Sequence, residues 1–138
     1  MDYSQTFAIS AAGMTLERTR VEVASLNLAN ANTVAGPDGK PYQPLHVVAR
    51  ASFGDTVAQG LGGVPSASVE PTMQAPRMVY EPGHPMANAR GFVAYAGVDA
   101  ATEMVTLMGA MRAYEANVAA MNTSRNMALK ALEIGGNT

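Results

Sequence analysis

The sequence contains no cysteine and no tryptophan, and it carries little charge. The absence of cysteine excludes a disulfide framework and any thiolate metal site. Charged residues make up 14% of the chain, well below the roughly 25% of typical soluble domains, whereas apolar residues make up 48%. A free monomer needs surface charge to stay soluble. We therefore expect this chain of 138 residues to cover part of its surface with a partner.

Several functional classes are excluded by what else is missing. The net charge of −2 argues against nucleic acid, which requires basic patches. No run of about 18 apolar residues exists that could form a membrane-spanning segment. The first residues, Met1 to Gln5, lack the basic stretch and apolar run of a secretory signal. These features predict a soluble chain, cytoplasmic unless a different export route carries it.

Proline is missing from both ends of the chain, since all 8 prolines lie between Pro37 and Pro85. Proline breaks the interior of helices, so its confinement predicts two helical ends around a β-rich or irregular middle. We expect an N-terminal helical region over residues 1–33, a small middle region over 34–98 and a C-terminal helical region over 99–138.

The middle region contains several turn signals and few runs that favour strands. Short β-like runs occur at residues 46–49, 77–80 and 91–95. Residues 51–68 are rich in glycine and small side chains, which predicts a long loop, flexible over about 51–64. This region is too small for a large sheet.

The N-terminal segment, about Ser4 to Asn30, predicts a helix that is apolar on two faces. A helix of this kind is more buried than an ordinary surface helix. It is either the central helix of this domain's own core or a helix that packs against other chains, and the small middle region favours the second interpretation. Its candidate assembly residues are Phe7, Met14, Leu16, Val21, Leu26, Leu28 and Asn30.

The C-terminal segment, about Asp99 to Ile134, predicts a longer helix with Asp99 as N-cap and Gly135–Gly136 as its end. Its apolar residues alternate at spacings of three and four for four heptads, as in a coiled-coil seam. That seam is Met104, Leu107, Met111, Tyr114, Val118, Met121, Arg125, Ala128 and Leu132. A small-residue face, which another helix could approach closely, is Ala110, Ala113, Asn117, Ala120, Ser124 and Ala131. The candidate assembly residues are Met104, Leu107, Met111, Tyr114, Asn117, Val118, Met121 and Leu132.

Together these segments predict a mainly α fold. The long N- and C-terminal helices are expected to pair as an antiparallel coiled coil, with a small β-rich or irregular middle region and a flexible loop. Catalytic motifs are missing, because neither His46 nor His84 has metal-ligand spacing and no phosphate-binding glycine loop is present. We therefore expect no enzyme activity, no cofactor and no metal.

Four stretches of the sequence resemble one family. Residues 25–33 (SLNLANANT) and 112–118 (RAYEANV) resemble the asparagine-rich and Tyr-x-x-Asn signatures of bacterial flagellar axial proteins. Residues 79–85 (VYEPGHP) and 89–93 (ARGFV) are similar to the proximal rod members of that superfamily. Glu81 stands where those proteins usually have aspartate. The motifs occur in the family's order.

The resemblance implies a structural subunit of the proximal rod in the flagellar basal body. Its implied partners are other copies of itself, other flagellar rod proteins and the flagellar type III export apparatus. It further implies export without a cleaved signal peptide, a periplasmic location in the rod, and termini that fold on assembly. Helices that cannot bury both faces alone order only when neighbours offset the lost entropy.

Two alternatives remain open. The first is a soluble helical-hairpin adaptor or an export-chaperone-like interaction protein, which would form stable helices in isolation. The second is an enzyme with a site built around His84 and Arg90.

Overall fold

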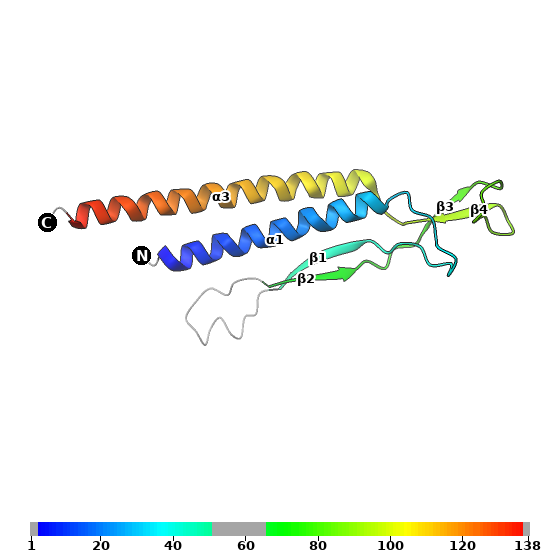
Figure 1. The fold of residues 1–138 in the computed structure, drawn as a ribbon, viewed down its shortest axis with the longest axis horizontal. Coiled ribbons are helices and arrows are strands. Elements are labelled where there is room, and N and C mark those ends of the chain that lie inside the picture. The colour runs from blue at the N-terminus through cyan, green and yellow to red at the C-terminus, as the bar shows by residue number, and fades with distance from the viewer. Residues whose placement is uncertain (1–2, 51–65, 137–138) are drawn as a thin grey trace.

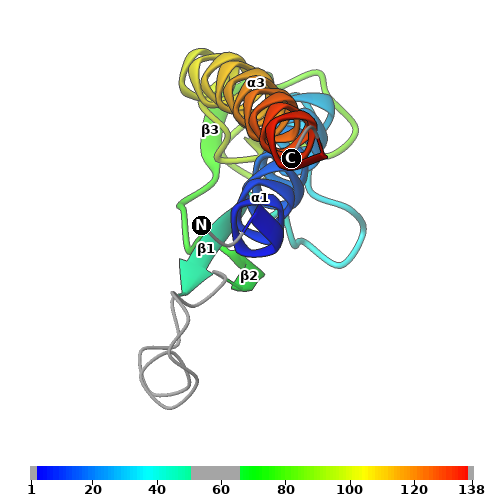
Figure 2. The ribbon, with the colours of Figure 1, turned by 90° about the vertical axis from the view of Figure 1, so that its left-hand side faces the viewer.

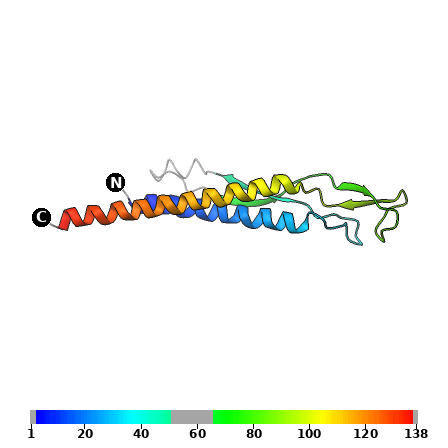
Figure 3. The ribbon, with the colours of Figure 1, turned by 90° about the horizontal axis from the view of Figure 1, so that it is seen from above.

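The computed structural model describes residues 3–50 and 66–136, and it is dominated by two long helices (Figure 1). Helix α1 spans Tyr3–Asn30 and helix α3 spans Ala100–Gly136. They lie side by side and run in opposite directions, with both chain ends at the same end of the molecule (Figures 1 and 3). The prediction of a mainly helical protein with a β-containing middle is confirmed. The expected flexible loop over 51–64 falls outside the described residues.

Two antiparallel strand pairs make up the middle. Strand β1, Leu45–Arg50, pairs with β2, Ser66–Pro71, and the register places Val47 opposite Val69. Figure 2 shows that α1 lies between this pair and α3. The prediction missed β2, whose first residues were expected to belong to the loop. Its residues, mostly small and polar, have weak strand propensity, and only pairing with β1 holds them extended.

The second strand pair forms the end of the molecule far from the chain termini (Figures 1 and 3). Strand β3, Arg77–Tyr80, pairs with β4, Phe92–Tyr95, close to the predicted limits. The segment that follows α1 pairs with the edge of β4, because the Ala35 amide donates to the Ala94 carbonyl at 2.9 Å. The second pair is thereby anchored to the end of α1.

The start and end of α3 follow from local chemistry. The Asp99 carboxylate accepts hydrogen bonds from the Ala101 amide at 3.1 Å and the Thr102 hydroxyl at 2.6 Å. This is the N-cap arrangement that satisfies free amides in the first turn, and the Thr102 hydroxyl is the main cause that lowers the pKa of Asp99. The helix continues through Gly136, slightly past its predicted end, within the usual variation of helix limits.

The core of the described residues is thin and consists of small side chains. Its buried apolar residues are Ala24, Ala31, Val93, Ala96 and Ala110. Within the described ranges, no helix combines the length and the hydropathy needed to cross a membrane, and no group of histidine, aspartate or glutamate side chains is close enough to hold a metal ion.

Candidate functional site

The surfaces of α1 and α3 that face each other are built from small and polar residues. On α1 the buried residues are Ser10, Glu17, Ala24 and Asn27. On α3 they are Ala110 and Ser124. We call Ser10, Glu17, Ala24, Ala110 and Ser124, with Gly13 and Asn117 between them, the small-residue seam. Asn27 is not part of it, because its side chain bonds the backbone of Leu45 in β1.

Gly13 and Asn117 mark how closely the two helices approach. A Cβ atom at Gly13 would lie 2.8 Å from Asn117 Oδ1, shorter than a van der Waals contact. The Asn117 amide is held in place, because its Nδ2 donates to the Ala113 carbonyl at 3.0 Å. Of the predicted small-residue face of α3, Asn117 lies against α1 of the same chain, and Ala110 and Ser124 are buried, whereas Ala120 and Ala131 are exposed.

The predicted assembly residues of α3 lie mostly beside this seam rather than in it. Met104, Met111, Tyr114 and Leu132 are exposed, by 55%, 48%, 40% and 72%. Leu107, Asn117, Val118 and Met121 are half-buried. A helix of 3.6 residues per turn places Met111 roughly 100° around from Ala110, so α3 carries a small row toward α1 and a methionine row next to it.

The predicted assembly residues of α1 flank its seam in the same way. Phe7, Met14, Leu16, Val21, Leu28 and Asn30 are half-buried, and Leu26 is exposed. Around the helix axis, Val21 lies roughly 60° to one side of Ala24 and Leu16 about 80° to the other. None of the apolar predicted residues of α1 is fully buried.

An open groove lies between α1 and α3, beside the small-residue seam. Val21, Met111 and Tyr114 line it, with Arg18 and Glu115 beside them, and its volume is about 400 Å³. Arg18 pairs with Glu22 at 3.0 Å, and both side chains are solvent-exposed. The groove is an apolar depression with charge at its border.

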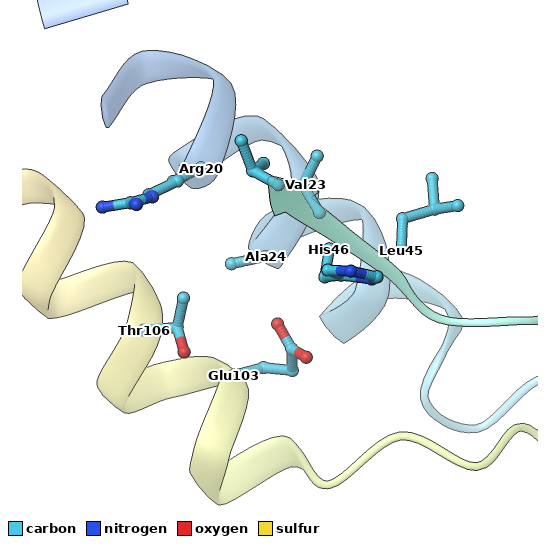
Figure 4. Close-up of a pocket in the computed structure, with 8 residues that line it drawn as sticks. Arg20, Val23, Ala24, Leu45, His46, Glu103 and Thr106 are labelled. Carbon is cyan, nitrogen blue, oxygen red and sulfur yellow. The ribbon is translucent and has the colours of Figure 1, made fainter. Parts of the chain in front are cut away.

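A second, smaller depression of about 180 Å³ lies where α1, α3 and β1 meet (Figure 4). Glu103 and Thr106 from α3, Arg20 and Ala24 from α1 and His46 from β1 surround it. The Thr106 hydroxyl donates to the Thr102 carbonyl at 3.0 Å, and His46 Nδ1 bonds the Thr72 hydroxyl at 3.0 Å.

Asn27 connects the end of α1 to the first strand pair and is fully buried. Its Oδ1 accepts hydrogen bonds from the Tyr42 hydroxyl at 2.8 Å and the Leu45 amide at 2.9 Å. Its Nδ2 donates to the Leu45 carbonyl at 2.8 Å. Burial, followed by the nearby Glu103 carboxylate, raises the pKa of Tyr42. Sequence reasoning placed Asn27 in a family signature but missed this contact.

Comparison with known proteins agrees with this arrangement of terminal helices. Residues 7–37 match the model of flagella basal body rod proteins, and residues 89–134 match the C-terminal model of flagellar basal body rod FlgEFG proteins. The flagellar basal-body rod protein FlgC of Escherichia coli is 43% identical, over 94% of this chain and 95% of that protein. The chain belongs to the FlgC family of flagellar basal-body rod proteins.

Other FlgC proteins give the same result across distant bacteria. The protein of Salmonella typhimurium is 42% identical over 94% of this chain and 95% of its own length. That of Bacillus subtilis is 36% identical over 92% of this chain and 94% of its own length. The resemblance stated from the sequence motifs is confirmed: this member of the FlgC family is a structural component of the rod in the flagellar basal body.

Proposed function

We propose that this chain polymerises through its terminal helices into the proximal rod, the part of the drive shaft that transmits torque from motor to hook. It catalyses no reaction in this role. Its partners are other copies of itself and other rod proteins, and the flagellar type III apparatus exports it to the periplasm without cleavage of a signal peptide.

The observation that carries this proposal is that the helices bury small and polar side chains and expose large apolar ones, the opposite of an ordinary soluble protein. Small and polar residues fill the seam between α1 and α3, whereas large apolar residues face outward. On α3 the outward set includes Met104, Val105, Met108, Met111, Leu129, Leu132 and Ile134. Exposed apolar surface of this extent on a soluble protein marks an interaction site. Neighbouring subunits would cover it in an assembled rod.

We further propose that the helix pair is an antiparallel coiled coil. The buried residues Ser10, Glu17 and Ala24 follow one another at intervals of seven, and on α3 the half-buried Asn117 lies seven residues from each of the buried Ala110 and Ser124. A strict seven-residue repeat favours supercoiled helices. The predicted methionine seam would then form the contact with other subunits.

Substitution of Met111 by aspartate tests the proposal. A charge placed on the outward apolar row would have to be desolvated between subunits, so cells with Met111→Asp are expected to make the protein but to lose rod assembly and motility. Val118→Asp should behave in the same way. Met73→Asp is the matched control, since Met73 is 98% exposed and lies in the segment between β2 and β3 rather than on a helix. Normal flagella in Met111→Asp cells would disprove the role of this row.

A further inference from the structure

Glu17 is the one charged residue that is buried among the residues that the structure describes. It belongs to the small-residue seam, and its side chain is 10% exposed. Its ion-pair partner is Arg20, whose Nη1 donates to Glu17 Oε1 at 2.9 Å and whose side chain is 38% exposed. Neither the outward apolar rows nor the join at Asn27 uses this ion pair, so its burial needs an explanation of its own.

The pair gains nothing from the closure of the helices. Glu17 and Arg20 both lie on α1, three residues apart, so they can meet on an isolated helix as well. Across residues 3–50 and 66–136, Arg20 is the only hydrogen-bond donor to the Glu17 carboxylate, so α3 supplies none. Closure therefore removes water from a carboxylate without giving it a new partner.

Burial of this carboxylate costs free energy for that reason. The attraction between two charges repays their lost hydration only when further hydrogen bonds satisfy the remaining lone pairs. Within the described ranges, only Oε1 of Glu17 accepts a hydrogen bond. The closed helix pair is therefore weaker than it would be with an apolar side chain of similar size at position 17.

The same helix carries a second ion pair that has the ordinary, exposed arrangement. Arg18 bonds Glu22 at 3.0 Å, and their side chains are 75% and 61% exposed. An exposed pair of this kind keeps most of its water whether or not α3 lies beside α1. The Glu17 pair opposes closure of the helices, whereas the Glu22 pair does not.

We propose that Glu17 weakens the helix pair so that α1 and α3 stay apart in the free chain until it has been exported. This inference rests on the proposed function and adds a regulation to it. A chain that passes through an export apparatus must first be opened, so a very stable helix pair would hinder export. In the rod, burial of large apolar side chains by neighbouring subunits offsets the cost of one buried carboxylate.

Circular dichroism of the purified chain tests the cost of Glu17, at a low and fixed concentration that keeps self-assembly out of the measurement. Glu17→Met should raise the ratio of paired to open chains by about fivefold or more. Glu17→Gln, which removes the charge and keeps the shape, should give a smaller rise. Methionine, glutamine and glutamate have similar helix propensities, so the gain reports pairing rather than α1 alone.

Glu22→Met is the matched control, because Glu22 lies on the same helix in an exposed ion pair. It should leave the helix content and the melting temperature as in the parent chain. Arg20→Met should change them in the opposite direction to Glu17→Met, since it leaves the buried carboxylate without its partner. A helix content that falls or stays the same in Glu17→Met, or rises no more than in Glu22→Met, would overturn the assignment, as would a rise in Arg20→Met.

The role in export is measured separately in cells. Glu17→Met should lower the share of this chain that leaves the cytoplasm and should reduce swimming, whereas Glu22→Met should change neither. Normal export of a Glu17→Met chain that has gained helix would contradict the role in export. The helix measurement uses no rod, so its failure in cells that swim normally leaves the proposed function intact.

Discussion

At the scale of single residues, Asn27 shows how one buried amide can fix the join between a helix and a strand. Its side chain makes two hydrogen bonds with the backbone of Leu45, the first residue of β1, and one with Tyr42. A buried amide left without partners is costly, so the helix end and the strand must be in place together. This couples α1 to the middle region.

Replacement of Asn27 by leucine should therefore destabilise the protein by about 2 kcal/mol, because the Leu45 amide and carbonyl lose their partner in a buried position. The free energy of unfolding in urea, followed by circular dichroism at fixed protein concentration, measures the effect. Asn30→Leu is the matched control, since the Asn30 amide bonds only the Leu26 carbonyl of its own helix. Equal losses from both substitutions would contradict the role assigned to Asn27.

Tyr42 adds a pH dependence at the same join. Folding raises its pKa above the ordinary value of 10.0, chiefly through burial. The stability that this neutral hydroxyl contributes is present below pH 10 and is lost as pH rises through the folded pKa. We expect the unfolding free energy to fall at alkaline pH, and the fall to be smaller in Tyr42→Phe.

Tyr95 serves as the comparison for that titration. Burial, and then the Glu81 carboxylate that its hydroxyl bonds at 3.1 Å, raise the pKa of Tyr95 as well. Tyr95→Phe should also reduce the fall in unfolding free energy at alkaline pH. The part of the fall that comes from Tyr42 should remain in this variant. Identical alkaline curves for the parent chain and Tyr42→Phe would show that this hydroxyl is not part of the join.

At the scale of the helices, the seam between α1 and α3 depends on the absence of a side chain at Gly13. Alanine at an exposed helical glycine normally stabilises by about 0.5–1 kcal/mol. Gly109 on α3 has open space around it, so Gly109→Ala should gain this amount. Gly13→Ala should gain less or lose stability, since its Cβ meets the Asn117 amide.

A double-mutant cycle isolates the close approach. Adding Asn117→Ala to Gly13→Ala removes the obstructing amide and should recover part of the difference from Gly109→Ala. Melting temperature and helix content at fixed concentration are the measurements. If Gly13→Ala stabilises as much as Gly109→Ala, the helices are farther apart than the structure has them.

The sequence predicted both helices, because proline confinement and helical periodicity are local signals. It also predicted β1, β3 and β4 from short β-like runs. Strand β2 was missed since its residues are extended only through pairing with a strand about 20 residues away, which no local pattern records. Distant pairing overrides weak local propensity.

The same limit applies to the assembly surfaces. Periodicity indicated that Met111 and Val21 lie on apolar faces, but it could not tell which face a neighbour covers. The equal seven-residue spacing of Ser10, Glu17 and Ala24 was the available signal for the seam on α1, and it is easily overlooked because two of these residues are polar. The predicted assembly residues stay predictions until subunit contacts are measured.

At the scale of the whole molecule, the distribution of side chains leaves little to hold an isolated chain together. The buried apolar residues are mostly alanines, whereas methionines and leucines on α3 face solvent. Burial of a leucine-sized side chain contributes about 1.5–3 kcal/mol, so the larger gain from the outward rows is available only when other subunits cover them. Stability should then depend on the presence of partners.

The isolated chain is therefore expected to show less helix by circular dichroism than the two helices of the structure contain, with helix content and melting temperature that rise with protein concentration. Mass action produces this dependence, because copies bind the folded form and not the unfolded one. Met111→Asp should flatten the concentration dependence, since it removes a surface for partners without touching the small-residue seam, whereas Met73→Asp should leave it unchanged. Full helix content at all concentrations would instead support a soluble helical-hairpin adaptor, because such a protein must bury its own apolar rows.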